Sequence, residues 1–342
     1  MDWLEEGNTD NPYGETAMRR SRILQSKWIV GTNPGQKVTQ AARLALCQRL
    51  SVTQEYIRLA AKRVETDVDL VHQLRISTRR SQAALQIFSD LLPPLSRDKT
   101  ITLLRKLRRA AGKVRDLDVL VLRLGHRAET SSDARLAALV ACMGNRREAA
   151  VRALAQARKK LTRQGFDDSV AMLIKRIQWR HDEAEPEFVN FAQQVYRSTA
   201  DEFLTAATAD LSAECSLHQM RLAGKKLRYT LELLSGVFEP AFRDNLYPAV
   251  QEIQEKLGRI NDHVTASLLL DEWRADFAPH DREAVAHLAH EERGFAEATG
   301  RQFRAWWTPL RIDDLHRNFE QIRTIPDSPA ALDSMPRGRD IA

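Results

Sequence analysis

Three side chains in the segment 71–80 have the types and the spacing that phosphate binding requires. In VHQLRISTRR, His72, Arg75 and Arg79 stand at i, i+3 and i+7, so on a helix they fall on one face. Seven residues at about 1.5 Å each spread this row over roughly 10 Å. Guanidinium groups bind phosphate oxygens through paired hydrogen bonds, and lysine supplies a compact positive charge. Such a row suits a polyanion with a phosphate at every step.

The same pattern occurs again at an offset of 146 residues, the separation of His72 from His218. At this offset 71–88 aligns with 217–234, 111–120 aligns with 257–266, and Pro94 falls on Pro240. Three matches in one register predict an internal duplication of a helical unit. The aligned basic pairs after the two histidines are Arg75 with Arg221, Arg79 with Lys225, and Arg80 with Lys226.

Basic residues are concentrated around the first row. The segment 71–124 contains 12 Lys and Arg against four Asp, a charge of +8 that exceeds the +6 of the whole chain. Like charges at this density repel one another unless a counter-anion is expected. In the second copy, 251–259 is diluted by two Glu, so we expect the first copy to bind an anion more strongly. The predicted polyanion site comprises His72, Arg75, Arg79, Arg80, Arg105, Arg108, Arg109, Lys113, Arg115, His218, Arg221, Lys225, Lys226, Arg228, Lys256 and Arg259.

Three acidic residues interrupt these basic segments. Asp116, Asp118 and Asp262 are interpreted as structural partners of Arg115 and neighbouring basic groups rather than as catalytic acids, because an uncompensated Arg inside a bundle is costly.

Two histidines and two glycines have other possible roles. His72 and His218 either contact the anion or form structural hydrogen bonds, and the sequence leaves both readings open. Gly112 and Gly258 lie inside predicted helices, where glycine is unfavourable, so they are expected to permit close helix approach.

The elements that must position these side chains are helices. Aromatic residues make up only 6% of the chain, and no proline lies between Pro34 and Pro93 or between Pro94 and Pro186. Apolar residues recur at helical spacing, and no hairpin signal separates alternating runs. An all-α fold is therefore predicted, with helices at 36–66, 68–92, 96–125, 131–163, 166–182, 186–212, 215–238, 241–275, 280–308 and 310–324.

The domain organisation follows from the duplication. Residues 36–183 form the first predicted repeat and 184–324 the second, as two tandem helical bundles. Residues 1–35 lack apolar periodicity and are predicted to be a disordered leader, and 325–342 a loose tail. Three cysteines without a CxxC motif, no apolar run of membrane length and no signal-peptide pattern favour a cytoplasmic protein without a membrane partner.

The paired H-x-x-R helix starts, with the TRR and GKKLRY continuations and the GKVRDLD and GRIND segments, resemble the CHAD family, the conserved-histidine α-helical domain. The resemblance covers about 290 residues, essentially everything between the two terminal segments. It implies two helical bundles related by a pseudo-two-fold axis around a basic surface or pore. It also implies binding of inorganic polyphosphate and association with polyphosphate granules, without known catalysis. Gln82 departs from the family pattern, where a basic residue is common, and is left out of the predicted site.

Two alternative functions stay open. A nucleic acid such as RNA would respond to the same charge, but aromatic residues for base stacking are scarce along the basic rows. A polyphosphate- or triphosphate-processing enzyme would need metal-binding carboxylates near a nucleophile, and no such motif, metal site or cofactor site is recognised. A solvated basic surface without a ligand is the structural alternative. We expect a non-enzymatic polyphosphate-binding protein of unknown oligomeric state.

Overall fold

The computed structural model describes residues 26–63, 67–131 and 134–322. Within these ranges the chain is helical, with one isolated β-bridge between Lys37 and Glu187. The predicted all-α fold is confirmed, and each of the ten predicted segments contains a helix. No helix of the described ranges is long and apolar enough to cross a membrane.

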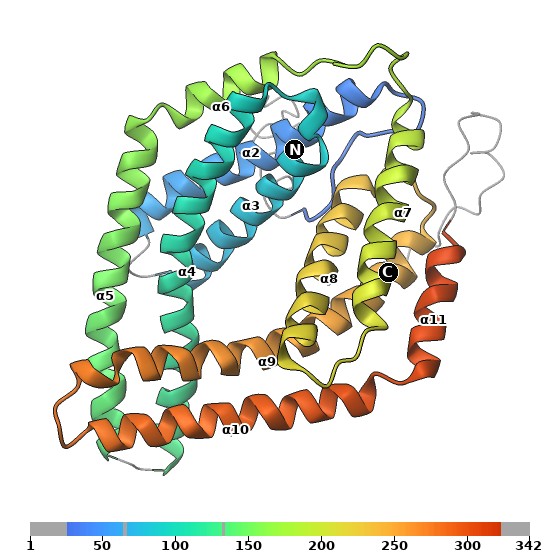
Figure 1. Ribbon diagram of the computed structural model, residues 1–342. Coiled ribbons are helices and arrows are strands. Elements are labelled where there is room, and N and C mark those ends of the chain that lie inside the picture. The colour runs from blue at the N-terminus through green and yellow to red at the C-terminus, as the bar shows by residue number, and fades with distance from the viewer. Residues whose placement is uncertain (1–25, 64–66, 132–133, 323–342) are drawn as a thin grey trace, which may run out of the picture.

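The first half of the chain forms four long helices, each packed on the next (Figure 1). The four helices are α2 (Val38–Arg63), α3 (Val68–Ile87), α4 (Pro94–Ser131) and α5 (Ala134–Arg163). The start of α3 is set locally, because the side chain of Asp67, its N-cap residue, accepts a hydrogen bond from the Leu70 amide. A 3₁₀ turn, η1 (Ser89–Leu91), and a short helix, α6 (Phe166–Lys175), complete this half.

The second half repeats this order of packing. The helices α7 (Phe188–Ala207), α8 (Glu214–Leu234), α9 (Tyr247–Trp273) and α10 (Arg282–Trp306) again pack each on the next. A π-helical turn, η2 (Phe242–Leu246), precedes α9, a 3₁₀ turn, η3 (Arg274–Asp276), follows it, and α11 (Pro309–Glu320) ends the described chain. The duplication itself stays a prediction, as do the repeat boundaries 36–183 and 184–324.

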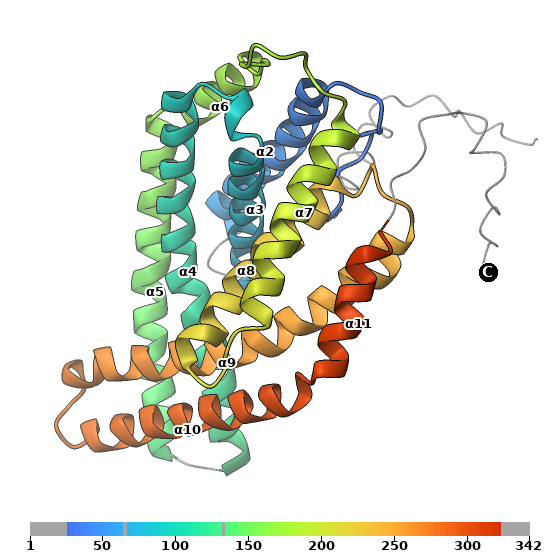
Figure 2. The ribbon, with the colours of Figure 1, turned by 45° about the vertical axis from the view of Figure 1, so that its right-hand side comes forward.

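Two apolar clusters hold these helices. The larger cluster joins both halves and includes fully buried Leu74 of α3, Phe203 of α7 and Leu227 of α8. The smaller one lies where the far ends of α4 and α5 meet the far ends of α9 and α10, with Met143 and Leu270 fully buried (Figures 1 and 2). The halves therefore touch through α3 and α8 and at this corner, and also where the chain before α2 pairs with the chain before α7.

The end of the predicted disordered leader, residues 26–35, is ordered in the structure. Residues 26–35 pack against the helices: Ile29 is buried, and Trp28 lies edge-on against Tyr247 with ring centroids 4.7 Å apart. These two apolar residues give the segment something to bury. Residues 1–25 of the predicted leader, the tail 325–342, and the ends of predicted helices at 64–66, 132–133 and 323–324 lie outside the described residues.

The predicted helix 166–182 is shorter than expected, because α6 ends at Lys175. The carbonyls of Ile174 and Ile177 accept hydrogen bonds from the guanidinium of Arg43 on α2, at 2.9 and 3.1 Å. The Gln178 amide donates to the carbonyl of Leu91 in η1. These tertiary partners replace the hydrogen bonds of a continued helix. The chain after α6 is thereby free to line the cavity described next.

Candidate functional site

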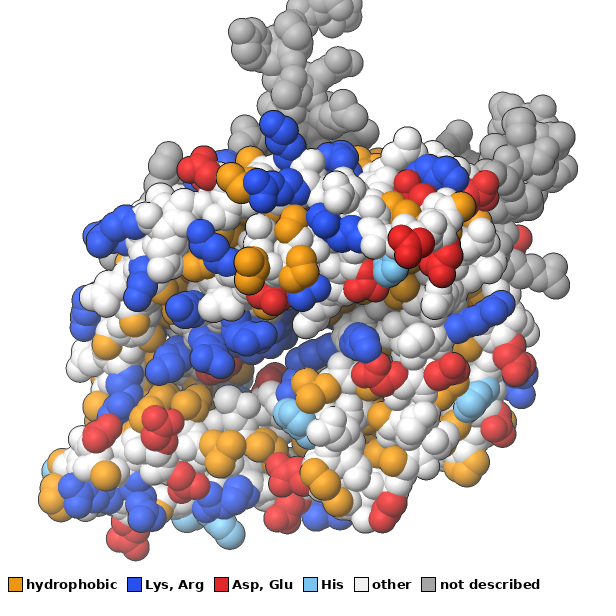
Figure 3. All heavy atoms as spheres, turned by 45° about the horizontal axis from the view of Figure 1, so that its top comes forward, with side chains coloured by type: hydrophobic (Ala, Val, Ile, Leu, Met, Phe, Trp, Pro, Cys, Tyr) orange, Lys and Arg blue, Asp and Glu red, His pale blue; other side chains and the backbone are white. Residues whose placement is uncertain are grey.

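A cavity of about 1340 Å³ lies between α3 and α4 on one side and α7 and α8 on the other. It is the hollow whose walls carry Lys and Arg side chains in Figure 3. The chain after α6 contributes Trp179, His181 and Glu183 to its lining. The helices α3 and α8, which begin with the two aligned H-x-x-R motifs, thus face one shared space.

Nine of the sixteen predicted site residues line this cavity, against three carboxylates, those of Asp90, Asp116 and Glu183. Six of the nine come from the first half of the chain and three from the second. The predicted convergence of the two basic rows is therefore present in the structure. The nine are Arg75, Arg79, Arg105, Arg108, Arg109, Lys113, Arg221, Lys225 and Lys226.

Arg75 is held in place by two neighbours on α4. Its Nη1 donates to Oδ1 of Asp116 at 3.2 Å, and a Cβ on Gly112 would lie 3.0 Å from that same nitrogen. Gly112 therefore permits a close approach, as predicted, and the group that approaches is the Arg75 guanidinium. Burial raises the pKa of Asp116, an effect that Arg75 opposes and Asp262 reinforces. Asp116 and Gly112 therefore fix the position of the Arg75 guanidinium, and Asp116 neutralises its charge only in part.

Lys225 is the most perturbed group of the cavity. Among the described residues it makes no hydrogen bond and no ion pair. Burial, together with the charges of Arg79, Arg221, Arg75 and Arg228, lowers its pKa to about 6. The lysine is therefore mostly deprotonated near neutral pH, although an anion placed beside it would favour its charged form.

Neighbouring arginines show the same repulsion. Burial and then Arg79 lower the pKa of Arg108 and of Arg221. The Arg221 Nε is buried and has no hydrogen-bond partner within the described ranges. Of the nine lining cations, Arg75 pairs with Asp116 and Lys226 pairs with Glu202. The excess of groups of one sign held close together still forms a site whose charge is complementary to a multivalent anion.

Arg80 and Arg228 lie outside the cavity lining, around a buried acid. Arg80 donates to both carboxylate oxygens of Glu232, at 2.6 and 3.1 Å, and Glu232 is fully buried. The Tyr247 hydroxyl donates to the same carboxylate at 2.9 Å, and the Arg228 guanidinium lies 5.2 Å from the Tyr229 ring centroid. The structure thus gives Arg80 a role in joining α3 to α8.

The five remaining predicted residues also lie outside the cavity lining. Half-buried His72 has a pKa lowered by burial and by Arg115, which is itself half-buried. Exposed His218 has a pKa lowered by its partial burial and then by Arg221. Lys256 pairs with Glu252 at 3.7 Å and lies 4.5 Å from the ring centroid of Trp306. Arg259 is exposed on α9. The structure leaves these five side chains out of the lining, although the charges of lining residues still act on His72 and His218.

The predicted acidic partners need a correction in detail. Asp116 pairs with Arg75 rather than with Arg115, and Asp118 pairs with Arg147 of α5, with Nε and Oδ1 2.5 Å apart. Asp262 acts on Arg221 only through its charge. Each is thus paired with, or acts on, a basic group other than Arg115, and the reason is that the partners come from neighbouring helices.

The prediction for Gly258 is wrong. A Cβ at Gly258 would meet nothing within 4 Å, so this glycine permits no close approach. The close approach in the second half occurs at Gly224 of α8, where a Cβ would lie 3.0 Å from Phe203 of α7 and would collide with the Gln254 amide of α9. The alignment of the two halves predicted this role for Gly258 on α9, whereas Gly224 on α8 has it in the structure.

Several uncharged lining residues were missed by the sequence analysis. Gln82 and Gln86 line the cavity at three and seven residues after Arg79, so the helical period of the basic row was a signal that could have found them. The buried Gln82 amide donates to the Ile101 carbonyl at 3.3 Å. Ser198 and Thr199 of α7 also line the cavity, and no charge pattern marks them in the sequence.

Comparisons with known proteins agree with this architecture. The crystal structure of the CHAD domain from the plant Ricinus communis matches with a TM-score of 0.66 at 24% identity, over 87% of this chain and 96% of that chain. PptA from Streptomyces chartreusis matches with a TM-score of 0.59 at 19% identity, over 80% and 99%. At these identities both structures show the fold alone. Comparison with curated proteins gives no match.

The family assignment comes from the sequence. The CHAD domain family model matches residues 45–271, well over half of the chain, and this range contains α3, α4, α7 and α8 with the whole cavity lining. The chain therefore belongs to the CHAD domain family.

Proposed function

We propose that the protein binds inorganic polyphosphate in the cavity between its two halves and catalyses no reaction on it. The observation that carries the proposal is the convergence of nine Lys and Arg side chains, from α3, α4 and α8, on one space with three carboxylates. The family membership supports it, since the CHAD resemblance implies polyphosphate binding. Association with polyphosphate granules would follow from such binding, and we propose it as the place of action.

The physical argument rests on charge neutralisation. In the empty cavity, burial and then the charges of Arg79 and three further arginines lower the pKa of Lys225 to about 6. A chain with a negative charge at every phosphate would neutralise several such groups at once and release the counterions of both partners. Arginine forks at Arg75 and Arg221 supply paired donors to phosphate oxygens.

The lack of exposed aromatic rings beside the basic rows favours polyphosphate over RNA as the ligand. Sequence-tolerant binding of single-stranded nucleic acid uses exposed rings on which bases stack. Tyr229 and Phe88, the aromatic residues nearest to the basic rows, are 7% and 0% exposed. RNA would therefore be held by charge alone there, as a weaker competitor.

Side-by-side titrations with long-chain polyphosphate, RNA and heparin, at low and at high salt, test the proposal. We expect polyphosphate to bind tightest at each salt concentration. Arg75→Glu combined with Arg221→Glu should weaken its binding by roughly a hundredfold or more, with the helical circular dichroism unchanged. Arg152→Glu, which alters an arginine that is 67% exposed on α5, is the control and should bind as the wild type does.

Two results would overturn the proposal. Equal affinity of the double variant and the wild type for polyphosphate would remove the cavity from the site. Release of phosphate from polyphosphate in the presence of Mg²⁺ or Mn²⁺, measured over hours with purified protein, would show an enzyme rather than a binding protein.

A further inference from the structure

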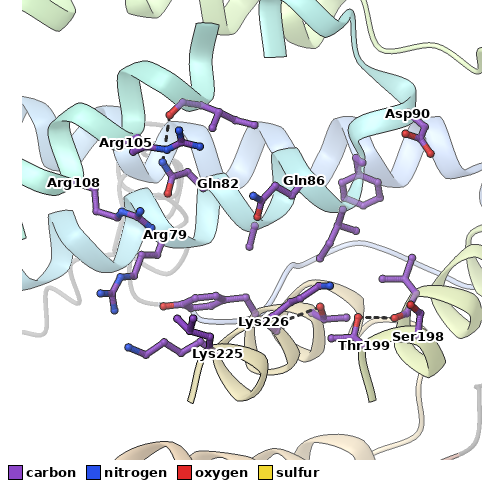
Figure 4. A pocket seen from close by; sticks show the side chains of 18 of the residues that line it. Arg79, Gln82, Gln86, Asp90, Arg105, Arg108, Ser198, Thr199, Lys225 and Lys226 are labelled. Carbon is purple, nitrogen blue, oxygen red and sulfur yellow. Dashed lines mark hydrogen bonds between the residues drawn. The ribbon is translucent and has the colours of Figure 1, made fainter. Parts of the chain in front are cut away.

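The lining of the cavity changes its chemistry from one end to the other. Figure 4 shows Arg79, Arg108 and Lys225 together at one end, and Asp90 and Ser198 at the opposite end. We call the region around Arg79, Arg108 and Lys225 the cationic half. The region around Asp90 and Ser198 is called the neutral half, because its side chains are uncharged apart from two carboxylates. It includes the lining residues next to these two, Ile87 and Gln194, and also Trp179 and Glu183, which follow the Gln178 amide that is bonded to Leu91.

The neutral half is a built part of the fold. The Gln178 amide donates to the Leu91 carbonyl at 3.2 Å, which fixes the chain after α6 beside η1. Phe88, which follows α3 directly, stacks on Phe191 of α7 with ring centroids 5.5 Å apart, so the end of α3 meets α7 beside this half. Its shape is therefore set by packing within the main core.

A chain of phosphates gains little from this half. The carboxylates of Asp90 and Glu183 repel phosphate oxygens, and the side chains of Ile87 and Phe191 offer no hydrogen bond. A polyphosphate bound in the cationic half would leave the neutral half to water. A ligand that makes contact with this half must therefore carry a part other than phosphate.

The groups in the neutral half match a nucleoside. The Trp179 indole already donates its Nε1 hydrogen to the Glu183 carbonyl at 2.6 Å, and its ring, tilted against that of His181 with centroids 4.7 Å apart, lines the cavity with it. An aromatic face of this kind stacks on a base. The Gln194 amide and the Ser198 hydroxyl offer donors and acceptors to base edges, while carboxylates such as that of Asp90 accept hydrogen bonds from ribose hydroxyls.

We infer that the cavity binds nucleoside polyphosphates, with the phosphates in the cationic half and the nucleoside in the neutral half. The inference depends on the proposed function only for the binding of the phosphates in the cationic half. A volume of about 1340 Å³ exceeds the roughly 300–1,000 Å³ of common small-molecule sites, so it can hold both parts of such a ligand.

Calorimetric titration with ATP, tripolyphosphate and long-chain polyphosphate, without magnesium and at one ionic strength, tests this. Tripolyphosphate carries at least as much negative charge as ATP, so tighter binding of ATP cannot come from charge. We expect ATP to bind about tenfold more tightly than tripolyphosphate, the effect of one stacked base. Equal or weaker binding of ATP overturns the inference and leaves the proposed function intact. If long-chain polyphosphate fails to bind, it is the proposed function that fails.

Two variants locate the nucleoside. Ser198→Tyr places a ring in the neutral half and should abolish the advantage of ATP while tripolyphosphate binds as before. Asn190→Tyr, at an exposed position of α7 outside the lining, is the matched control and should keep that advantage. Trp179→Phe should keep most of the affinity but lose the quenching of tryptophan fluorescence by ATP. An ATP advantage that survives Ser198→Tyr, or quenching that survives Trp179→Phe, places the nucleoside elsewhere and contradicts the inference.

Discussion

At the scale of single residues, the cavity is distinguished by charges that lack partners. The charges of Arg75 and Arg79 of α3 and of Arg221 and Arg228 of its own helix act on Lys225. Asp116 of α4, which lines the same cavity, is engaged by Arg75. Most basic residues on a protein surface are surrounded by water and mixed charge. A half-buried lysine beside four arginines costs stability unless an anion is bound.

This arrangement predicts that polyphosphate binding depends on pH. The pKa of Lys225 is about 6 in the free protein, and a bound polyanion raises it, so binding takes up a proton above that pH. Affinity should be highest at or below about pH 6 and should fall as the pH rises towards about pH 8, by at most about tenfold per unit. Calorimetry in buffers of different ionisation enthalpy measures the uptake. Lys225→Arg should bind with a flat profile, and a wild-type profile that is equally flat would contradict the prediction.

The same lysine predicts a conflict between stability and binding. Its pKa is about 6 in the folded protein but about 10.4 in an unfolded chain, so the unfolded state binds the extra proton between these values. Stability contributed by this site therefore rises with pH in that window and is lost as the pH falls through it. Lys225→Met should raise the free energy of unfolding at neutral pH by roughly 1 kcal/mol and weaken polyphosphate binding. Urea denaturation checks it, and a less stable variant would be contrary to it.

Gly112 and Gly258 provide a matched pair of tests. A Cβ at Gly112 would lie 3.0 Å from Nη1 of Arg75, and a Cβ at Gly258 would meet nothing within 4 Å. Both changes to Ala should gain helix propensity of up to about 1 kcal/mol. Gly112→Ala should also displace the Arg75 guanidinium and weaken polyphosphate binding several-fold, whereas Gly258→Ala should leave binding unchanged. Equal binding by the two variants would show that the position of Arg75 is unimportant.

At the scale of elements, α3 and α8 are joined by an ionic cluster beside the cavity. Glu232 of α8 is fully buried and receives Arg80 of α3, with Arg49 of α2 at 3.9 Å. Burial lowers the pKa of Arg49 to about 10, a direction that Glu232 opposes. Three helices therefore depend on one carboxylate for the position of their charged side chains.

Removing that carboxylate should loosen the two walls of the site. Glu232→Gln leaves Arg80 and Arg49 without their buried counter-charge, so we expect a loss of about 3–5 kcal/mol in the free energy of unfolding. Glu252→Gln breaks an exposed pair with Lys256 and should cost less than about 1 kcal/mol. Chemical denaturation compares the two. Similar losses in both variants would mean that the buried cluster does not join the helices.

At the scale of the whole molecule, contacts between the halves on different sides frame the cavity. The packing of α3 on α8 is one of them, and another is the corner where Leu124 of α4 packs in one apolar cluster with Leu270 of α9. At this corner Arg123 and His263 both reach the buried carboxylate of Glu292, at 2.8 and 2.7 Å. The cavity lined by both halves stays open because the halves contact each other around it rather than across it.

Only cations that face this space should contribute to the salt dependence of binding. Arg109 and Arg259 are both exposed, but Arg109 lines the cavity and Arg259 does not. Arg109→Ala should reduce the slope of log affinity for polyphosphate against log salt by about 1. Arg259→Ala should leave the slope as in the wild type. The titrations at several salt concentrations decide it, and equal slopes for the two variants would favour a diffuse surface site.

The sequence alone predicted what depends on neighbours along the chain. The positions of the helices, the absence of a sheet and the alignment of Arg75 with Arg79 on one face all follow from helical periodicity. The family resemblance rests on the same local motifs. Adjacent residues on a helix point about 100° apart, so Arg79 and Arg80 leave the helix in different directions, but nothing local showed which of them would face the cavity. The structure places Arg79 in the cavity and Arg80 on Glu232.

Only the tertiary structure decided which side chains meet. The neutral half of the cavity is formed by α7 and the chain after α6, which carry no basic row and whose positions depend on Arg43, Leu91 and Phe88. The glycine that permits close helix approach in the second half is Gly224 rather than Gly258, because packing partners come from other helices. Periodicity fixes the face that a residue shares with its helical neighbours, whereas contacts between helices distant in the chain determine what covers that face.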